Sequence, residues 1–196
     1  MINVAVIVGS TRPGRKALAI AEWVGGIAAQ RADARFEIVD LADFHLPLLD
    51  EPLPPSFGKA QHAHTRAWGA RIAAFDAFVF VAPEYNHGPS AALKNAIDFL
   101  YAEWNNKAAG LVTYGGSGGL RAAEQLRLIL AEVQVATVRA QVALSLFTDF
   151  QDFTAFSPGP RQAPSVSAML DQLVAWGGAL RAMRTAAAKA PEPAHA

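Results

Sequence analysis

The chain has 196 residues, with 17 Lys and Arg against 17 Asp and Glu, so its formal net charge is +0. It contains no cysteine, which excludes disulfides, thiolate metal sites, iron–sulfur clusters and cysteine nucleophiles, so any redox chemistry must come from a bound cofactor. A surface without net charge is a poor binder of polyanions, and we expect no nucleic-acid partner.

The chain also lacks the sequence features of a membrane or exported protein. No segment reaches the roughly 18 consecutive apolar residues of a membrane span. Met1 to Val4 lead directly into an apolar run, without a basic region or a small-residue cleavage site. We therefore expect no membrane contact and a cytoplasmic location. Apolar residues make up 52% of the chain, a surplus that a buried subunit interface explains better than a membrane.

Short apolar runs alternate with longer stretches of helical period, a pattern typical of parallel strands joined by crossover helices. The expected strands cover residues 2–8, 35–41, 77–82, 110–114 and, less distinctly, 135–144. The expected helices cover residues 15–29, 59–75, 90–104, 120–133 and 165–184. Five strands and five helices fill one doubly wound α/β sheet with helices on both faces. We expect a single domain over residues 1–185 and a disordered, Ala/Pro-rich tail over residues 186–196.

Residues 46–58 hold four of the chain's 12 prolines, which predicts a long, stiff loop and no helix there. His62 and His64, which follow this loop, are two residues apart. On a helix that spacing turns the two side chains in different directions, so we expect no metal site at these histidines.

The loop after the first strand, Gly9 to Lys16, has the composition of an anion site. It turns on glycines and enters a helix whose free N–H groups and positive dipole end attract a phosphate. Its hydroxyls and cations belong to Ser10, Thr11, Arg12, Arg15 and Lys16. The residues favour a monophosphate, and the alternative is an ordinary strand-to-helix turn with solvated basic side chains.

Two better-known phosphate motifs are excluded in this loop. A Walker A loop needs a lysine and a hydroxyl residue directly after its last glycine, but Gly14 is followed by Arg15, Lys16 and Ala17. A dinucleotide fingerprint needs the spacing GxGxxG. Neither this loop nor the glycine cluster at residues 115–119 supplies that spacing.

Two further loops end neighbouring strands. Residues 83–89 (PEYNHGP) place an aromatic ring, an amide, a carboxylate and an imidazole after the third strand. Residues 114–119 (YGGSGG) contain four glycines, which let the backbone approach a ligand closely. Taken singly, either loop is equally well a surface turn. Because ligands of open parallel sheets bind beyond the carboxyl ends of the strands, the three loops together indicate a site for a phosphorylated planar ring.

The segments GSTRPGRKA, PEYNHGPSAALKNAIDFLY and YGGSGGLRAAEQLR resemble the NADPH-dependent FMN reductase family, a flavodoxin-like group that includes azobenzene, quinone and chromate reductases. The resemblance spans roughly residues 1–185. It implies a flavodoxin-like fold with strand order 2-1-3-4-5 and a noncovalently bound FMN. Many relatives place a serine or threonine where this chain has Gly14-Arg15-Lys16-Ala17, so backbone N–H groups and cations would replace that hydroxyl.

The resemblance also implies the cofactor-binding residues. Around the phosphate these are Ser10, Thr11, Arg12, Arg15, Lys16 and Ala17. Against the isoalloxazine ring they are Pro83, Glu84, Tyr85 and Asn86, and Gly115, Gly116 and Ser117 close over the flavin.

The function that the resemblance implies is NAD(P)H-dependent reduction of FMN, followed by transfer of hydride equivalents to a quinone, an azo compound, free flavin or an oxidised metal species in a ping-pong cycle. Hydride transfer needs no acid–base side chain, so we assign no catalytic residue and no metal. The implied assembly is a homodimer, or a dimer of dimers, with helices 90–104 and 120–133 across the two-fold axis.

Two other functions stay open. A flavodoxin-type electron carrier would bind FMN without oxidising NAD(P)H itself, although carriers usually have a strongly charged face. A hydrolase with Ser10 as nucleophile would need a histidine base held by an acid, and the sequence offers no recognisable third member.

Overall fold

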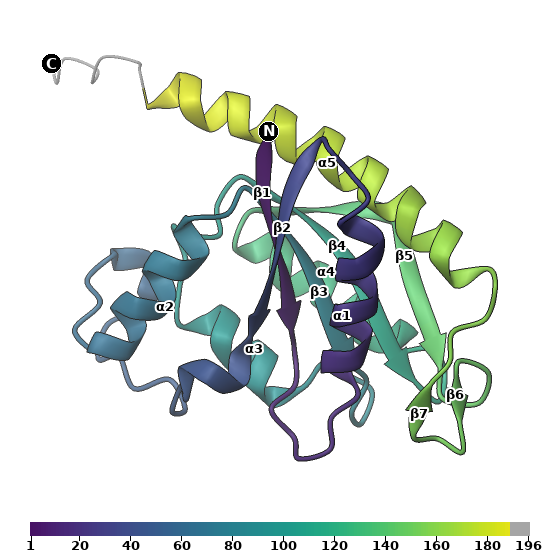
Figure 1. Ribbon diagram of the computed structural model, residues 1–196. Coiled ribbons are helices and arrows are strands. Elements are labelled where there is room, and N and C mark those ends of the chain that lie inside the picture. The colour runs from purple at the N-terminus through teal and green to yellow at the C-terminus, as the bar shows by residue number, and fades with distance from the viewer. Residues whose placement is uncertain (189–196) are drawn as a thin grey trace, which may run out of the picture.

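The computed structural model describes residues 1–188 (Figure 1). Its central layer is a five-stranded sheet in the order β2-β1-β3-β4-β5, with every neighbouring pair parallel. The strands are β1 (Ile2–Val8), β2 (Ala34–Asp40), β3 (Ala77–Pro83), β4 (Lys107–Gly115) and β5 (Val135–Ser145). The predicted flavodoxin-like fold and strand order are confirmed.

Five α-helices cover the two faces of the sheet. On one face lie α1 (Ala17–Ala28) and α5 (Gln162–Ala187), and on the other α2 (Ala63–Ala73), α3 (Ala91–Asp98) and α4 (Leu120–Glu132). A hydrophobic core lies on each face of the sheet. Alternate residues of each strand belong to the two cores, because successive side chains of a strand point to opposite faces. Val79 packs under α1 and α5, for example, whereas Phe78 and Phe80 pack under the other helices.

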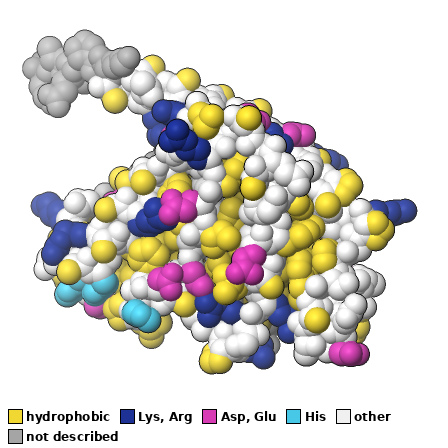
Figure 2. Space-filling model, in the orientation of Figure 1, with side chains coloured by type: hydrophobic (Ala, Val, Ile, Leu, Met, Phe, Trp, Pro, Cys, Tyr) yellow, Lys and Arg dark blue, Asp and Glu magenta, His cyan; other side chains and the backbone are white. Residues whose placement is uncertain are grey.

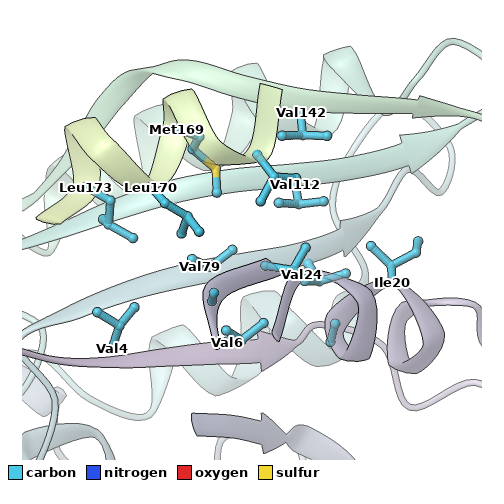
Figure 3. Close-up of a cluster of buried hydrophobic side chains, with 14 of the residues drawn as sticks. Val4, Val6, Ile20, Val24, Val79, Val112, Val142, Met169, Leu170 and Leu173 are labelled. Carbon is cyan, nitrogen blue, oxygen red and sulfur yellow. The ribbon is translucent and has the colours of Figure 1, made fainter. Parts of the chain in front are cut away.

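The core beneath α5 shows how closely these layers approach. Figure 3 shows Met169 and Leu170 of α5 in one buried cluster with valines of the sheet, among them Val79 and Val112. A Cβ atom added at Gly110 would lie only 2.8 Å from the sulfur of Met169. Glycine at this point of β4 therefore lets a long methionine lie flat on the sheet.

Several predicted elements differ in length from those of the structure: α2 covers residues 63–73 instead of 59–75, and α5 covers residues 162–187 instead of 165–184. β4 begins at Lys107, three residues before its predicted start. α3 ends at Asp98, so the predicted helix 90–104 was wrong over its last residues. The chain there leaves the helix in turns, because the buried side chain of Trp104 folds back and donates from Nε1 to the carbonyl of Ile97 over 3.1 Å.

Four short elements were not predicted. β6 (Phe150–Gln151) and β7 (Ala155–Phe156) form an antiparallel hairpin after β5. η1 (Leu41–Phe44) and η2 (Pro55–Phe57) are single 3-10 turns, the second inside the proline-rich loop.

α5 includes Ala186 and Ala187, the first residues of the predicted tail, and residues 189–196 lie outside the described residues. Within residues 1–188, no helix has the length and apolar character needed to cross a membrane.

Candidate functional site

The sheet register brings the three predicted loops together. Gly9, directly after β1, donates its N–H to the carbonyl of Val81 in β3 over 2.8 Å. Pro83 at the end of β3 pairs with Tyr114 of β4, and Glu84 N donates to Tyr114 O over 2.8 Å. All three loops therefore leave the same carboxyl edge of the sheet, as the sequence predicted.

A cavity of about 250 Å³ opens between these loops. Seven predicted site residues line it: Arg12, Arg15, Lys16, Pro83, Glu84, Tyr85 and Gly115. Gly14, Tyr114, Leu146 and Phe153 complete the lining. The other predicted residues lie nearby: Ser10 and Ala17 are buried, Asn86 sits in a tight turn, and Gly116 and Ser117 are exposed after Gly115. Thr11 instead lines a separate cavity of about 520 Å³ between η1 and α3.

The start of α1 has the free donors that a phosphate needs. α1 begins at Ala17 without a side-chain cap and without an acidic residue in its first turn. Its first N–H groups therefore lack intrahelical partners, and the helix dipole favours an anion at this point. The hydroxyl of Ser10 lies 3.2 Å from that of Tyr85 and accepts the N–H of Arg12 over 3.4 Å. These contacts fix the loop around the start of α1.

Tyr114 supplies an independent sign of an anion-binding site. Its side chain is 5% exposed, and its hydroxyl lies near Ser10, Tyr85 and the N–H of Ala17 without a hydrogen bond of good geometry. Burial, together with neighbouring Tyr85, raises the pKa of Tyr114 above its usual range, so the hydroxyl remains a neutral donor. A buried donor without an acceptor is costly, and a phosphate oxygen would supply the acceptor. The residues present thus fit the phosphate of FMN.

The three cations of the loop play different parts. Arg15 forms an ion pair with Asp40 at the end of β2, so its charge is already balanced. Arg12 holds its guanidinium carbon 6.0 Å from the centroid of the Tyr85 ring. The ammonium of Lys16 lies 5.7 Å from the ring centroid of Phe150. Neither Arg12 nor Lys16 has a carboxylate partner among residues 1–188, so these two cations are available to a ligand.

Glu84 is a positioning carboxylate. Its side chain is 3% exposed and accepts hydrogen bonds from the backbone and side chain of Arg121 and, at 3.4 Å, from Ala122 N. Burial alone would raise the pKa of Glu84, but these hydrogen bonds and the charge of Arg121 outweigh it and lower the pKa below its usual range. Glu84 is therefore ionised, and its carboxylate is bound to Arg121 and Ala122 at the start of α4.

Tyr85 is presented by a tight turn. Tyr85 and Gly88 exchange backbone hydrogen bonds of 2.9 and 3.1 Å. Asn86 and His87 between them have φ angles of 48° and 73°, in the left-handed region. Asparagine and histidine enter this region more readily than most residues, which explains how PEYNHG makes the turn.

The glycine loop also depends on backbone geometry. Gly119 has φ of +71°, and a Cβ atom there would lie 2.6 Å from the backbone nitrogen of Tyr114. The carbonyl of Gly115 accepts hydrogen bonds from Gly118 and from Leu146 in the loop after β5. That loop supplies Leu146 and Phe153 to the cavity, and sequence analysis missed both. The rule used for the other strand ends, applied to β5, would have found them.

The histidine pair differs from the sequence expectation. The rings of His62 and His64 are stacked, with centroids 5.2 Å apart and planes 7° from parallel. The expectation that the two side chains point in different directions was wrong. It assumed that both residues lie on a helix, but His62 is the N-cap residue of α2 and has an extended backbone. His64 Nε2 lies 2.9 Å from a carboxylate oxygen of Asp50, which ties the proline-rich loop to α2. Figure 2 shows histidine side chains gathered over α2 and this loop. Over residues 1–188 no group of three metal-binding side chains is present.

The fold is that of a flavodoxin-like α/β protein, and its candidate site is a cavity at the carboxyl edge of the sheet. The family model for NADPH-dependent FMN reductase matches residues 2–149. The chain belongs to this family. It is accordingly an oxidoreductase that uses FMN as cofactor and NAD(P)H as co-substrate.

Individual relatives agree with the family. An NAD(P)H-dependent FMN reductase of Schizosaccharomyces pombe is 43% identical over 149 residues, covering 75% of this chain and 74% of the relative. An FMN-dependent NADPH-azoreductase of Staphylococcus saprophyticus is 30% identical over 150 residues, covering 74% and 78%. The solved flavoenzyme NAD(P)H:(acceptor) oxidoreductase FerB from Paracoccus denitrificans matches with a TM-score of 0.71 at 20% identity, covering 91% of this chain and 98% of that one. The likeness to FerB shows the fold alone.

Proposed function

We propose that the protein transfers reducing equivalents from NAD(P)H to a quinone or azo compound, with free flavin and oxidised metal species as further acceptors. The observation that carries the proposal is the cavity where the phosphate loop meets the loops after β3 and β4, beside the buried, unpartnered hydroxyl of Tyr114. Relatives named as azoreductase and as quinone reductase support the choice of acceptors. Bound FMN supplies the hydride chemistry, and the protein supplies position, polarity and access.

The cofactor is held noncovalently in this proposal. The first N–H groups of α1, the hydroxyls of Ser10 and Tyr114, and the cations Arg12 and Lys16 bind the phosphate. Arg15 acts indirectly, because its ion pair with Asp40 fixes the loop. Residues 83–86 and residues 115–117 would hold the ring, and the Glu84–Arg121 contact joins these two loops.

The order of reaction is ping-pong: NAD(P)H and the acceptor use the same opening one after the other. Initial rates measured at several fixed acceptor concentrations test this order. Parallel lines in double-reciprocal plots support it, and lines that intersect contradict it. The alternative, a flavodoxin-type electron carrier, predicts no oxidation of NADPH by the purified protein without an added reductase.

The assembly in this proposal is a homodimer or a dimer of dimers. On α4, Leu126 and Leu130 are buried in the core of the chain itself, but Leu120 and Leu128 are exposed. The proline-rich loop exposes further apolar side chains, including Leu48 and Phe57. Such surfaces favour an interface between two copies, with Phe57 beside the partner's flavin. Sedimentation measurements test the assembly, and cell fractionation tests the cytoplasmic location, which remains a prediction.

A further inference from the structure

The hairpin formed by β6 and β7 has an unusual turn. Its turn residues run from Gln151 to Thr154, and Thr154 N donates to Gln151 O over 2.9 Å. Asp152 and Phe153, at the two central positions, have φ angles of 48° and 56°. Such turns prefer asparagine or aspartate followed by glycine, because most side chains in the left-handed region crowd their own backbone. A phenylalanine at the second central position is therefore strained.

Burial does not compensate for this strain. The side chain of Phe153 is 54% exposed. Its ring meets the ring of Phe147 edge to face, with centroids 5.3 Å apart and planes at 84°. Phe147 is itself exposed. Two large apolar rings thus face solvent at one point of the surface, held in a backbone conformation that glycine would adopt more easily.

The base of the hairpin keeps the turn in place. Phe150 is buried and packs on Phe156 with ring centroids 5.2 Å apart. The buried carboxylate of Asp149 accepts the N–H groups of Ser145 and Gly159 over 2.9 and 3.0 Å. A strained residue persists where its surroundings fix it, and such residues gather at functional sites.

The two rings border the FMN cavity. Phe153 lines the cavity with Arg12 and Tyr85. Phe147 lies beside the glycine loop, since a Cβ atom at Gly116 would be 3.7 Å from its Cε2 atom. Figure 1 shows β6 and β7 at the end of the sheet toward which the strand arrows point, which is the edge that carries the site.

We propose that Phe147 and Phe153 form an aromatic wall that binds the flat ring of a reactant beside FMN. This inference rests on the proposed function. Aromatic side chains hold flat rings by offset-stacked or edge-to-face contacts. Among the reactants that carry such a ring are a quinone acceptor and NAD(P)H, through its adenine. The family model matches residues 2–149, so Phe147 lies within the match and Phe153 lies beyond it.

The variant Phe153→Gly separates binding from folding. Glycine relieves the positive φ, so the variant unfolds at the same or a higher temperature than the wild type. Loss of one aromatic contact weakens ring binding by about five- to ten-fold. Fluorescence titration of the oxidised, FMN-loaded protein with 1,4-naphthoquinone and with NADP⁺ measures the two Kd values. Trp176→Ala is the matched control, because it removes a 47% exposed aromatic side chain from α5, outside the cavity lining.

Kinetics then identify which ring binds. If the quinone binds, Phe153→Gly loses kcat/KM with 1,4-naphthoquinone but not with ferricyanide. If adenine binds, the loss occurs with NADPH but not with reduced nicotinamide mononucleotide, which has no adenine. Either pattern supports the wall. Unchanged Kd values for both ligands overturn it, and so does an equal loss of FMN affinity, because the rings would then hold the flavin itself. A wild-type protein that binds these ligands but does not oxidise NADPH contradicts the proposed function alone.

Discussion

Glu84, directly after β3, and Arg121 in the first turn of α4 join the loop after β3 to the loop after β4. Arg121 donates to the Glu84 carboxylate from its backbone nitrogen over 2.9 Å and from Nε over 2.6 Å. The carboxylate thereby replaces the missing cap of α4, whose N-cap residue is Gly119. One side chain thus sets the spacing between residues 83–86 and the glycine loop.

The variant Glu84→Gln tests this spacing. Glutamine keeps the size of the side chain but presents an NH₂ group to donors that need an acceptor. We expect the free energy of unfolding to fall by about 1–3 kcal/mol and FMN affinity to fall about ten-fold. Chemical denaturation and FMN fluorescence measure the two effects. Asp98→Asn is the control, because Asp98 forms an exposed ion pair with Lys94 on α3 and such pairs contribute about 0–1 kcal/mol. Equal effects of both variants would contradict a special role for Glu84.

Tyr114→Phe tests the phosphate pocket. The variant removes a buried hydroxyl that has no partner, so the protein without FMN should be as stable as the wild type or more stable. FMN should bind about ten-fold more weakly, because a hydrogen bond to a charged phosphate is lost. Riboflavin, which lacks the phosphate, should bind both proteins equally. Loss of riboflavin affinity as large as that of FMN would refute the assignment of Tyr114 to the phosphate.

The elements that sequence analysis predicted well are those whose side-chain pattern fixes their environment. β1 and β3 are continuous apolar runs, so their burial on both faces was evident. β4 was predicted too short, and the structure begins it at Lys107, a charged residue that it buries. The turn at Phe153 was not predictable from local sequence, because it violates the residue preferences of its own turn type.

The buried lysine predicts a pH dependence of stability. Lys107 Nζ donates to the carbonyl of Ile72 over 2.9 Å. Burial and the charge of Arg184 lower the pKa of Lys107 to about 8 from 10.5, against the opposing charges of Asp76 and Glu103. Between these two pH values the unfolded chain binds a proton that the folded chain does not. The folded state therefore gains stability as pH rises from about 8 to 10.5, by on the order of 3 kcal/mol.

Denaturation of Lys107→Met across the same pH range measures this contribution. The variant should lack the rise that the wild type shows. Lys59→Met, at an exposed lysine, should keep it. A wild-type curve that is flat or falls between pH 8 and 10.5, relative to the variant, would contradict the lowered pKa.

The sequence predicted which loops form the site, but it did not predict the contacts that individual side chains make there. The carboxyl-edge rule identified the loops after β1, β3 and β4, and seven of the predicted residues line the cavity. The partnership of Arg15 with Asp40 depends on the pairing of β1 with β2. The buried position of the Tyr114 hydroxyl likewise depends on how α1 packs over the sheet. Neither relationship has a signal in the local sequence.

An anaerobic titration of the FMN-loaded protein with NADPH tests the central claim most directly. The account predicts flavin absorbance bands in the purified protein that one equivalent of NADPH bleaches and a quinone restores. A protein that binds no FMN, or whose flavin bands persist in excess NADPH and NADH, would contradict it.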